Sequence, residues 1–209
     1  MNSNAISDLI ILGAGGHSRV LIDLVSLSDN KIIGVVDPKL NPGDLFLGVS
    51  VYSEEELFNQ WEIGEIGVLN GVGGMPNNTN RSDLTKKLNK MGYKMTSVIH
   101  KTAFVSHNSV LNDGVQIMAG AILQPDVFVG KDTIINTSVS IDHDCHIGKY
   151  CHIAPGSTLS GNVVIGDNCH IGTGTVVVNN VNIGENSVIG AGSVVYKDIP
   201  SNTKFIQSK

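Results

Sequence analysis

His143 and Asp144 are neighbouring residues whose side chains could carry a proton transfer. A neutral imidazole can take the proton released when an amine or hydroxyl attacks a thioester, and an adjacent carboxylate can raise the basicity of that imidazole. Asn136 lies close before the pair, and we group it with them as one candidate constellation. From the residues alone, two interpretations of His143 stay open, a general base and a surface histidine.

A glycine-rich segment, Gly13-Ala14-Gly15-Gly16-His17-Ser18, could bind an anionic ligand. Backbone N–H groups between a strand and a helix form an anion site that suits a diphosphate. Ser18 stands where a dinucleotide-binding motif has its third glycine, so a nicotinamide cofactor is weakly supported. Asp37 ends the second apolar run, where a carboxylate can accept hydrogen bonds from a ribose or a base. The alternative for the glycine segment is a helix N-terminus that binds no ligand.

A repeat of six residues must position the first constellation. From Phe104 to Ile199 the chain divides without insertion into sixteen hexads, each with an aliphatic second residue, and the sixth residue is small or aliphatic. Two inward side chains per hexad therefore alternate with outward polar ones, as in strands. A unit this short cannot bury its own apolar face, so the pattern predicts a stacked solenoid. About five coils of three hexads would fit this stretch.

Within the hexad frame, His143 falls at an outward corner, where a core histidine would not be placed. Cys145, Cys151 and Cys169 all occupy the sixth position, so we expect them to point inward as small apolar side chains. Glycine follows an isoleucine at the second position in five hexads, where we expect a turn to need backbone freedom. These glycines are Gly148, Gly166, Gly172, Gly184 and Gly190.

The first hundred residues alternate predicted strands with predicted helices, and this is typical of a small parallel α/β domain. The opening strand, glycine turn, helix and strand form a Rossmann-like βαβ unit. We therefore predict an α/β domain over residues 1–100 and a solenoid over residues 101–209. The predicted strands are 9–12, 31–36, 66–69 and 95–99, and the predicted helices are 18–28, 54–60 and 80–91.

Composition excludes several classes of function. The chain has 209 residues, a formal net charge of −5 and 16% charged residues, with no long basic cluster, so we expect neither nucleic acid nor a membrane as partner. No apolar run approaches the roughly 20 residues that span a bilayer, and the N-terminus lacks the pattern of a secretory signal. We expect a cytoplasmic protein, in which three cysteines make no disulfide framework.

The sequence as a whole resembles the hexapeptide-repeat sugar acetyltransferases. The segments that carry the resemblance are GAGGHS, VVDPK, SVIHKTAFVS and INTSVSIDHDCHIGKYCHIAPGSTLSGNV. They are similar to the subgroup that contains sialic-acid O-acetyltransferases and the N-acetyltransferases of UDP-4-amino sugars of the bacillosamine type. The resemblance implies that the solenoid is a left-handed parallel β-helix. It also implies acetyl-CoA as cosubstrate, a nucleotide sugar as acceptor, and a homotrimer with active sites between subunits.

The same resemblance implies a role for each matching residue. His143 would be the general base and Asp144 its support. The acetyl-CoA site would be formed by Asn136, His152, Gly161, Thr173 and Ala191. The nucleotide sugar would be held by Gly13, Gly15, Gly16, His17, Asp37, Lys39 and Gly73.

Three other functions are weighed against transfer to a sugar amine. O-acetylation of sialic acid or of another sugar hydroxyl would use the same machinery. A noncatalytic nucleotide-sugar scaffold would leave the outward His143 and Asp144 unexplained. A zinc site of the β-helical carbonic anhydrase kind could use the histidines at the first frame position, but no two histidines have the five-residue spacing of those enzymes. We therefore expect no metal.

Overall fold

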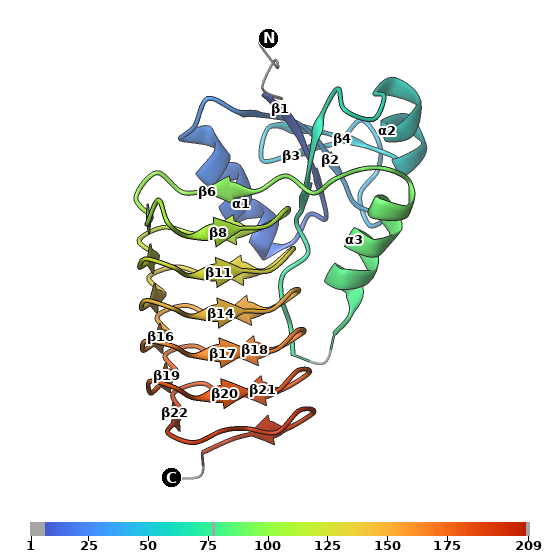
Figure 1. The fold of residues 1–209 in the computed structure, drawn as a ribbon. Coiled ribbons are helices and arrows are strands. Elements are labelled where there is room, and N and C mark those ends of the chain that lie inside the picture. Colours follow the sequence, from blue (N-terminus) through green and yellow to red (C-terminus); the bar gives the residue numbers. More distant parts are fainter. Residues whose placement is uncertain (1–6, 77, 208–209) are drawn as a thin grey trace. The chain divides into compact units, whose positions relative to one another are not determined.

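The computed structural model describes residues 7–76 and 78–207, and these form two compact units (Figure 1). The first unit comprises residues 7–73 and 79–96. The second comprises the short segment at residues 74–78 together with the chain from residue 97 onward. The short segment is thus continuous in sequence with the first unit on both sides, although it packs as part of the second.

The first unit contains one mostly parallel sheet with the strand order β3-β4-β2-β1-β5. Strand β1 (Asp8–Leu12) pairs in parallel with β2 (Lys31–Val36) and β5 (Gly67–Asn70), and β2 pairs in parallel with β4 (Val49–Tyr52). The two-residue β3 (Leu45–Phe46) adds an antiparallel edge. Leu9, Ile10 and Ile11 are 0% exposed, as expected for a parallel strand that is covered on both faces.

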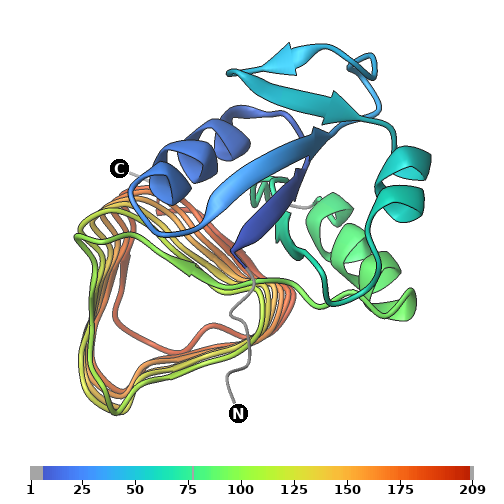
Figure 2. The same ribbon diagram turned by 90° about the horizontal axis from the view of Figure 1, so that it is seen from above.

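Three helices cover this sheet: α1 (Gly16–Ser26), α2 (Glu54–Gln60) and α3 (Asn80–Lys90). Leu57 of α2 and Leu88 of α3 join the apolar cluster of Ile10, while Ile22 of α1 packs with Val35. Helix α1 therefore lies on the opposite face of the sheet from α2 and α3, as Figure 2 shows. This is the α/β arrangement that the sequence predicts.

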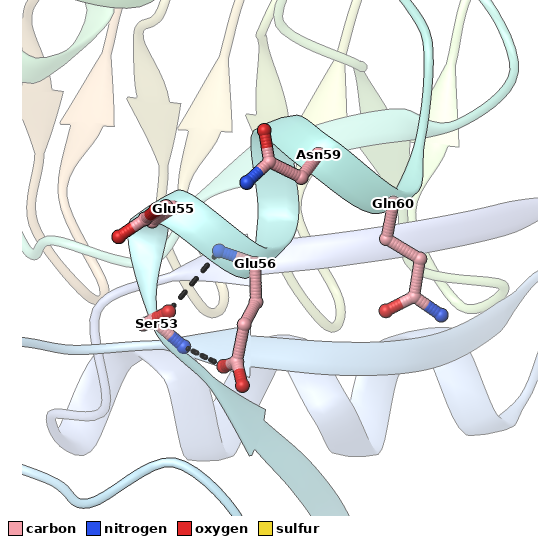
Figure 3. A pocket seen from close by; sticks show the side chains of 5 residues that line it. All are labelled: Ser53, Glu55, Glu56, Asn59 and Gln60. Atoms are coloured by element: carbon pink, nitrogen blue, oxygen red, sulfur yellow. Dashed lines mark hydrogen bonds between the residues drawn. The ribbon is translucent and has the colours of Figure 1, made fainter.

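The N-terminus of α2 is closed by its own side chains. Ser53 accepts a hydrogen bond from the Glu56 backbone, and the Glu56 carboxylate accepts one from the Ser53 backbone, which makes a capping box. A small surface pocket beside this cap is lined by residues of the same turn and helix, Ser53, Glu55, Glu56, Asn59 and Gln60 (Figure 3). None of these lining residues is a predicted site residue, so the pocket contributes nothing to the candidate site.

The strand predicted over residues 95–99 divides between the two units. Met95 makes only an isolated parallel bridge with Val68 of the α/β sheet. Strand β6 (Val98–Ile99) instead pairs with β9 of the solenoid. The prediction of one strand is wrong because the apolar run changes sheets in its middle.

The second unit is built from two-residue strands that stack in three parallel sheets. One sheet, which we call sheet A, contains β7 (Phe104–Val105), β10 (Ile122–Leu123), β13 (Ser140–Ile141), β16 (Thr158–Leu159), β19 (Val176–Val177) and β22 (Val194–Val195). Sheet B contains β8 (Val110–Leu111), β11 (Phe128–Val129), β14 (His146–Ile147), β17 (Val164–Ile165) and β20 (Asn182–Ile183). Sheet C contains β6, β9 (Gln116–Ile117), β12 (Ile134–Ile135), β15 (His152–Ile153), β18 (His170–Ile171), β21 (Val188–Ile189) and β23 (Lys204–Phe205).

The hexad frame is confirmed strand by strand. Each strand from β7 to β22 begins at the first residue of a predicted hexad, and Ile141, for example, pairs with Leu159 one coil further on. The inward second residues from Ile117 to Val195 are 0–1% exposed and form a continuous core. Cys145, Cys151 and Cys169 join this core at 1% exposure. The result is a left-handed β-helix, which is triangular when viewed along its axis (Figure 2).

The corners of the β-helix show why glycine recurs in it. From residue 114 to residue 192 the fifth position of every hexad has a positive φ, and it is filled mainly by Gly, Asp and Asn. Glycines at the third position, such as Gly148 and Gly166, do not have this conformation. A Cβ on Gly166 would lie 2.5 Å from the Glu185 backbone nitrogen. The prediction of backbone freedom at the third position is therefore wrong, because glycine is needed there for the close approach of the next coil.

The described residues contain no helix that is both long and apolar enough to cross a bilayer.

Candidate active site

His143 lies at the corner of the β-helix between β13 of sheet A and β14 of sheet B. Asp144 follows in the left-handed conformation, with φ of 60°, which Asp tolerates better than most residues. This turn brings the Asp144 carboxylate to 2.7 Å from His143 Nδ1. Both side chains are more than half exposed. The imidazole is therefore held by one carboxylate while its Nε2 side remains accessible for proton transfer.

A second carboxylate flanks the same imidazole. Asp142 Oδ1 accepts a hydrogen bond of 2.9 Å from the His143 backbone N–H. The pKa of His143 is raised above 6.5, first by the hydrogen bond to Asp144 and next by the charge of Asp142. A carboxylate at Nδ1 also fixes the tautomer with the proton on Nδ1, so that Nε2 carries the lone pair. The pair can therefore act as a base of enhanced strength.

His152 lies on sheet C, and both of its ring nitrogens have partners. Nδ1 is 2.6 Å from the Gly74 carbonyl oxygen, and Nε2 is 3.0 Å from the Asn136 amide nitrogen. Since a carbonyl only accepts, Nδ1 carries the proton and Nε2 accepts from Asn136. The Asn136 oxygen is itself bonded to the Thr137 backbone N–H at 2.8 Å, which orients the amide. The structure thus joins two of the predicted acetyl-CoA residues.

His170 stacks directly below His152 as its Cα partner in the next coil. The ring centroids are 5.0 Å apart and the ring planes meet at 81°. Burial, with a smaller effect of His152, lowers the pKa of His170 to about 4. His152 and His170 therefore lie one above the other in successive coils, and His170 is neutral near pH 7. Within residues 7–76 and 78–207, no three His, Cys, Asp or Glu side chains form a group that could hold a metal ion.

The remaining predicted acetyl-CoA residues divide between two corners. Gly161 lies between β16 and β17, at the same corner as His143 but one coil further on. Thr173 and Ala191 lie at the corner between sheets C and A, where Asn136 also lies. One chain therefore places His143 and Gly161 at the carboxyl ends of the strands of sheet A, and Thr173 and Ala191 at the amino ends of these strands.

In the α/β unit, the predicted substrate residues gather at the carboxyl ends of β1, β2 and β5. Gly13 follows β1, Asp37 and Lys39 follow β2, and Gly73 follows β5. Ligands of open parallel sheets bind at such ends, beside the strand where the order reverses. Strand β1 is that strand here, because β2 lies on one side of it and β5 on the other. A Cβ on Gly73 would lie 3.5 Å from His17 Cβ, so these two predicted residues are neighbours.

The glycine loop is shaped by Ser18 and Asp37. The Ser18 hydroxyl is 2.6 Å from the Gly13 carbonyl oxygen and 3.1 Å from that of Gly71. The Asp37 carboxylate accepts from the Ala14 backbone N–H at 2.7 Å and from the Lys39 backbone N–H at 2.8 Å. Asp37 therefore braces the glycine loop with one oxygen and the turn after β2 with the other, contacts that the sequence did not reveal.

Helix α1 begins directly after this loop and has no side-chain cap at Gly15. A Cβ added to Gly15 or Gly16 would meet nothing within 4 Å. The two glycines therefore leave space beside the N-terminus of the helix, as an anion site requires.

Comparison with known proteins supports the same two-part architecture. Residues 8–88 match the family model described as the PglD N-terminal domain, and residues 126–161 and 162–197 match that of the bacterial transferase hexapeptide. A solved mutant of perosamine N-acetyltransferase from Caulobacter crescentus, in complex with CoA and GDP-perosamine, is similar with a TM-score of 0.87. The two chains are 33% identical, over 97% of this chain and 95% of that one. The chain belongs to the hexapeptide-repeat sugar acetyltransferases.

Two further solved structures resemble this acetyltransferase along nearly its whole length. The acetyltransferase domain of PglB from Neisseria gonorrhoeae has a TM-score of 0.84 and 30% identity, over 93% of each chain. WeeI from Acinetobacter baumannii has a TM-score of 0.81 and 26% identity, over 93% of this chain and 94% of that one. Both the α/β unit and the β-helix are therefore shared with these proteins.

Three residues that contact the candidate site residues were not found from the sequence. Asp142 directly precedes His143, and a carboxylate at that position could have been recognised from the sequence as a second neighbour of the imidazole. His170 could have been assigned from its spacing of one coil from His152. Gly74 gave no signal, since its contact with His152 joins residues 78 positions apart.

Proposed function

We propose that this enzyme transfers the acetyl group of acetyl-CoA to the amine of a nucleotide-linked sugar, of the UDP-4-amino-4,6-dideoxy type. The observation that carries the proposal is the His143–Asp144 pair, a base of raised pKa that lies outward on a β-helix corner. The solved relative in complex with CoA and GDP-perosamine supports the same pair of substrate classes, a coenzyme A derivative and a nucleotide sugar.

In the proposed reaction, the sugar amine attacks the thioester carbonyl and forms the new C–N bond. His143 Nε2 takes the proton of the amine, and Asp144 stabilises the resulting imidazolium through Nδ1. The C–S bond then breaks, and the leaving thiolate of CoA takes the proton from the imidazolium, which returns His143 to its neutral form. A hydrogen-bond donor near the corner would stabilise the tetrahedral oxyanion. The three cysteines are buried in the core and would not reach the thioester. We therefore propose direct transfer without an acyl-enzyme intermediate on a cysteine.

The α/β unit would select the acceptor. The open N-terminus of α1 offers backbone donors to the diphosphate, and the loops after β2 and β5 would contact the nucleoside and the sugar. We assign this role to Gly13, Gly15, Gly16, His17, Asp37, Lys39 and Gly73. Because Asp37 already braces the loop, its contribution would be mainly to the shape of the diphosphate site.

We further propose a homotrimer whose active sites lie between subunits. The proposed acetyl-CoA residues lie at opposite ends of the strands of sheet A, so one chain does not bring Gly161 and Thr173 together. If sheet A faces the threefold axis, the His143 corner of one subunit meets the Thr173 corner of the next. Sheet A also carries outward apolar side chains that are 38–55% exposed in the single chain, namely Phe104, Ile122, Val176 and Val194.

A panel of acceptors tests the assignment. The release of free CoA thiol is measured with UDP-, GDP- and dTDP-linked amino sugars and with sialic acids. We expect turnover with a nucleotide-linked amino sugar, the UDP-linked 4-amino sugar being the best, and measurable binding of the matching nucleoside diphosphate. Turnover with sialic acid alone, without affinity for any nucleoside diphosphate, would overturn the proposal in favour of O-acetylation. Nucleotide-sugar binding without any thiol release would indicate a scaffold.

A further inference from the structure

We propose that Gly161 is a positioning residue for His143, and that the missing side chain at Gly161 leaves the space in which the imidazole is held against Asp144. The inference builds on the proposed role of His143 as the base. It assigns to Gly161 a task distinct from contact with acetyl-CoA.

The two residues occupy the same corner in successive coils. The Asn162 backbone N–H donates to the His143 carbonyl oxygen at 2.9 Å, and that of Asn180 donates to the Gly161 carbonyl at 3.1 Å. These bonds fix the vertical spacing of the corner. Any side chain at residue 161 must therefore project beside the one at residue 143.

The His143 ring lies where that side chain would begin. A Cβ built on Gly161 falls 2.8 Å from His143 Cε1, 2.9 Å from Nε2 and 3.4 Å from Nδ1. Non-bonded carbon atoms are in favourable contact at about 3.5–4.0 Å. All three of these distances are shorter than that, and the two below 3.0 Å are strongly repulsive. An added methyl group would thus press on the edge of the ring that carries both nitrogens.

The backbone does not itself require glycine at this position. Gly156 and Gly174 have positive φ values of 67° and 66°, which favour glycine, but Gly161 lies outside that region. Gly166 also differs, since its Cβ would meet the backbone of the next coil. At Gly161 all three of the nearest atoms belong to the His143 side chain. The backbone can therefore accommodate alanine at residue 161, but the alanine methyl group would clash with the His143 imidazole.

The ring can yield without unfolding the corner. The His143 side chain is 59% exposed, and its hydrogen bond at 2.7 Å joins it to Asp144. A methyl group at residue 161 would turn the ring toward solvent and lengthen or break this bond. The base would lose both its orientation and the largest cause of its raised pKa.

The first test is Gly161→Ala in the full-length enzyme, with Asn179→Ala as the matched control at the same corner one coil further on. We expect G161A to fold with an unchanged melting temperature and to lose about 10- to 100-fold in kcat, a part of the roughly 10²- to 10⁴-fold that a general base contributes. N179A should keep the wild-type kcat. A wild-type kcat for G161A would overturn the proposal.

A double-mutant cycle separates this role from acetyl-CoA binding. If Gly161 acts through His143, then adding G161A to His143→Ala lowers kcat no further, because the ring that it displaces is already gone. The Kd for CoA, measured by calorimetry, should change little in G161A. Losses that multiply in the double mutant, or a Kd that rises as much as kcat falls, would show that Gly161 acts on the cosubstrate instead.

An NMR titration tests the positioning without relying on activity. The His143 Cε1–H signal, assigned by its absence in H143A, should titrate at a lower pH in G161A than in the wild-type protein. An unchanged titration would refute the steric contact even if the enzyme is an acetyltransferase. A lowered titration together with full activity in H143A would instead retain the contact and refute the proposed base.

Discussion

At the scale of single residues, the environment of His143 is set by its position on the corner. The preceding Asp142 bonds to the backbone, the following Asp144 bonds to the ring, and Gly161 leaves room beside the ring. Each neighbour acts on a different property of the imidazole: charge, tautomer and orientation. A histidine on a flat strand face would have none of these constraints together.

Replacing His143 by alanine tests the base directly. We expect kcat to fall by about two to four orders of magnitude, the usual contribution of a general base. The fold should remain intact because the side chain is more than half exposed. Circular dichroism and the melting temperature provide the control. A kcat within about threefold of the wild-type value would remove His143 from the role.

Replacing Asp142 by asparagine tests the electrostatics. Asparagine keeps an oxygen for the His143 backbone N–H but removes the charge that raises the pKa of the imidazole. The base must be neutral to act, so kcat/KM falls as the pH drops through this pKa. In D142N the pKa is lower, and the acidic limb of the profile should move to lower pH. An acidic limb that stays in place would show that another group controls it.

The contact between His143 and Asp144 could be predicted from the sequence, but the contacts that hold His152 could not. Asp144 is adjacent to His143, so chain connectivity alone brings the two together. The bond from His152 to the Gly74 carbonyl depends instead on how a loop after β5 packs on the β-helix. The brace of Asp37 on Ala14 is equally nonlocal. Spacing gives no information on such contacts.

At the scale of elements, the β-helix coil has two kinds of required residue. The fifth frame position needs a residue that tolerates positive φ, and the third position often needs a residue without a side chain. The first need is conformational and the second is steric. Both follow from backbone hydrogen bonds that hold successive coils in register, such as the one from the Gly166 N–H to the Ile183 carbonyl.

Replacing Gly166 by alanine tests the steric need. Its Cβ would lie 2.5 Å from the Glu185 backbone nitrogen, so the coils must separate locally. We expect a loss of about 1–3 kcal/mol in the free energy of unfolding, the usual cost of overpacking. Urea denaturation provides the measurement, and Val164→Ala, at an outward position that is 36% exposed, is the control. Equal stability of G166A and V164A would contradict the steric explanation.

The hexad frame predicted almost every strand of the β-helix because the period is imposed by geometry and repeats sixteen times. Single strands without repetition were harder to assign. The apolar run at residues 95–99 looks like one strand, yet only its last two residues form one, in a sheet of the other unit. Its pairing with β9 could be recognised only if the coils were known to continue before Phe104.

At the scale of the whole molecule, the two units divide the proposed tasks. The α/β unit holds the loops that would bind the nucleotide, and the β-helix holds the proposed base and acetyl-CoA residues. The two groups of acetyl-CoA residues on either side of sheet A make the proposed active site dependent on assembly. Activity and oligomeric state should therefore be lost together.

Replacing Ile122 by aspartate tests this dependence. Ile122 is 40% exposed on sheet A, and a carboxylate there would be buried without a partner at the proposed interface. We expect light scattering to show monomers and the thiol-release assay to show little activity. Val110→Asp, at a position that is 55% exposed on sheet B, is the control and should stay trimeric. An active trimer of I122D would place the interface on another face.

The strands from β6 to β19 each stack on the strand 18 residues later, as in the pairing of His152 with His170. This stacking also limits how the length of the β-helix can change. Inserting or deleting a cassette of 18 residues leaves every later side chain on its own sheet and changes only the length of the β-helix. A cassette of six or twelve residues between His143 and His152 would preserve the hexad frame and the core, yet it would rotate His152 onto a different sheet. A duplication of one or two hexads would thus keep the repeat pattern but take His152 away from Gly74 and Asn136. The length of the β-helix between His143 and His152 can therefore change only by whole coils of 18 residues.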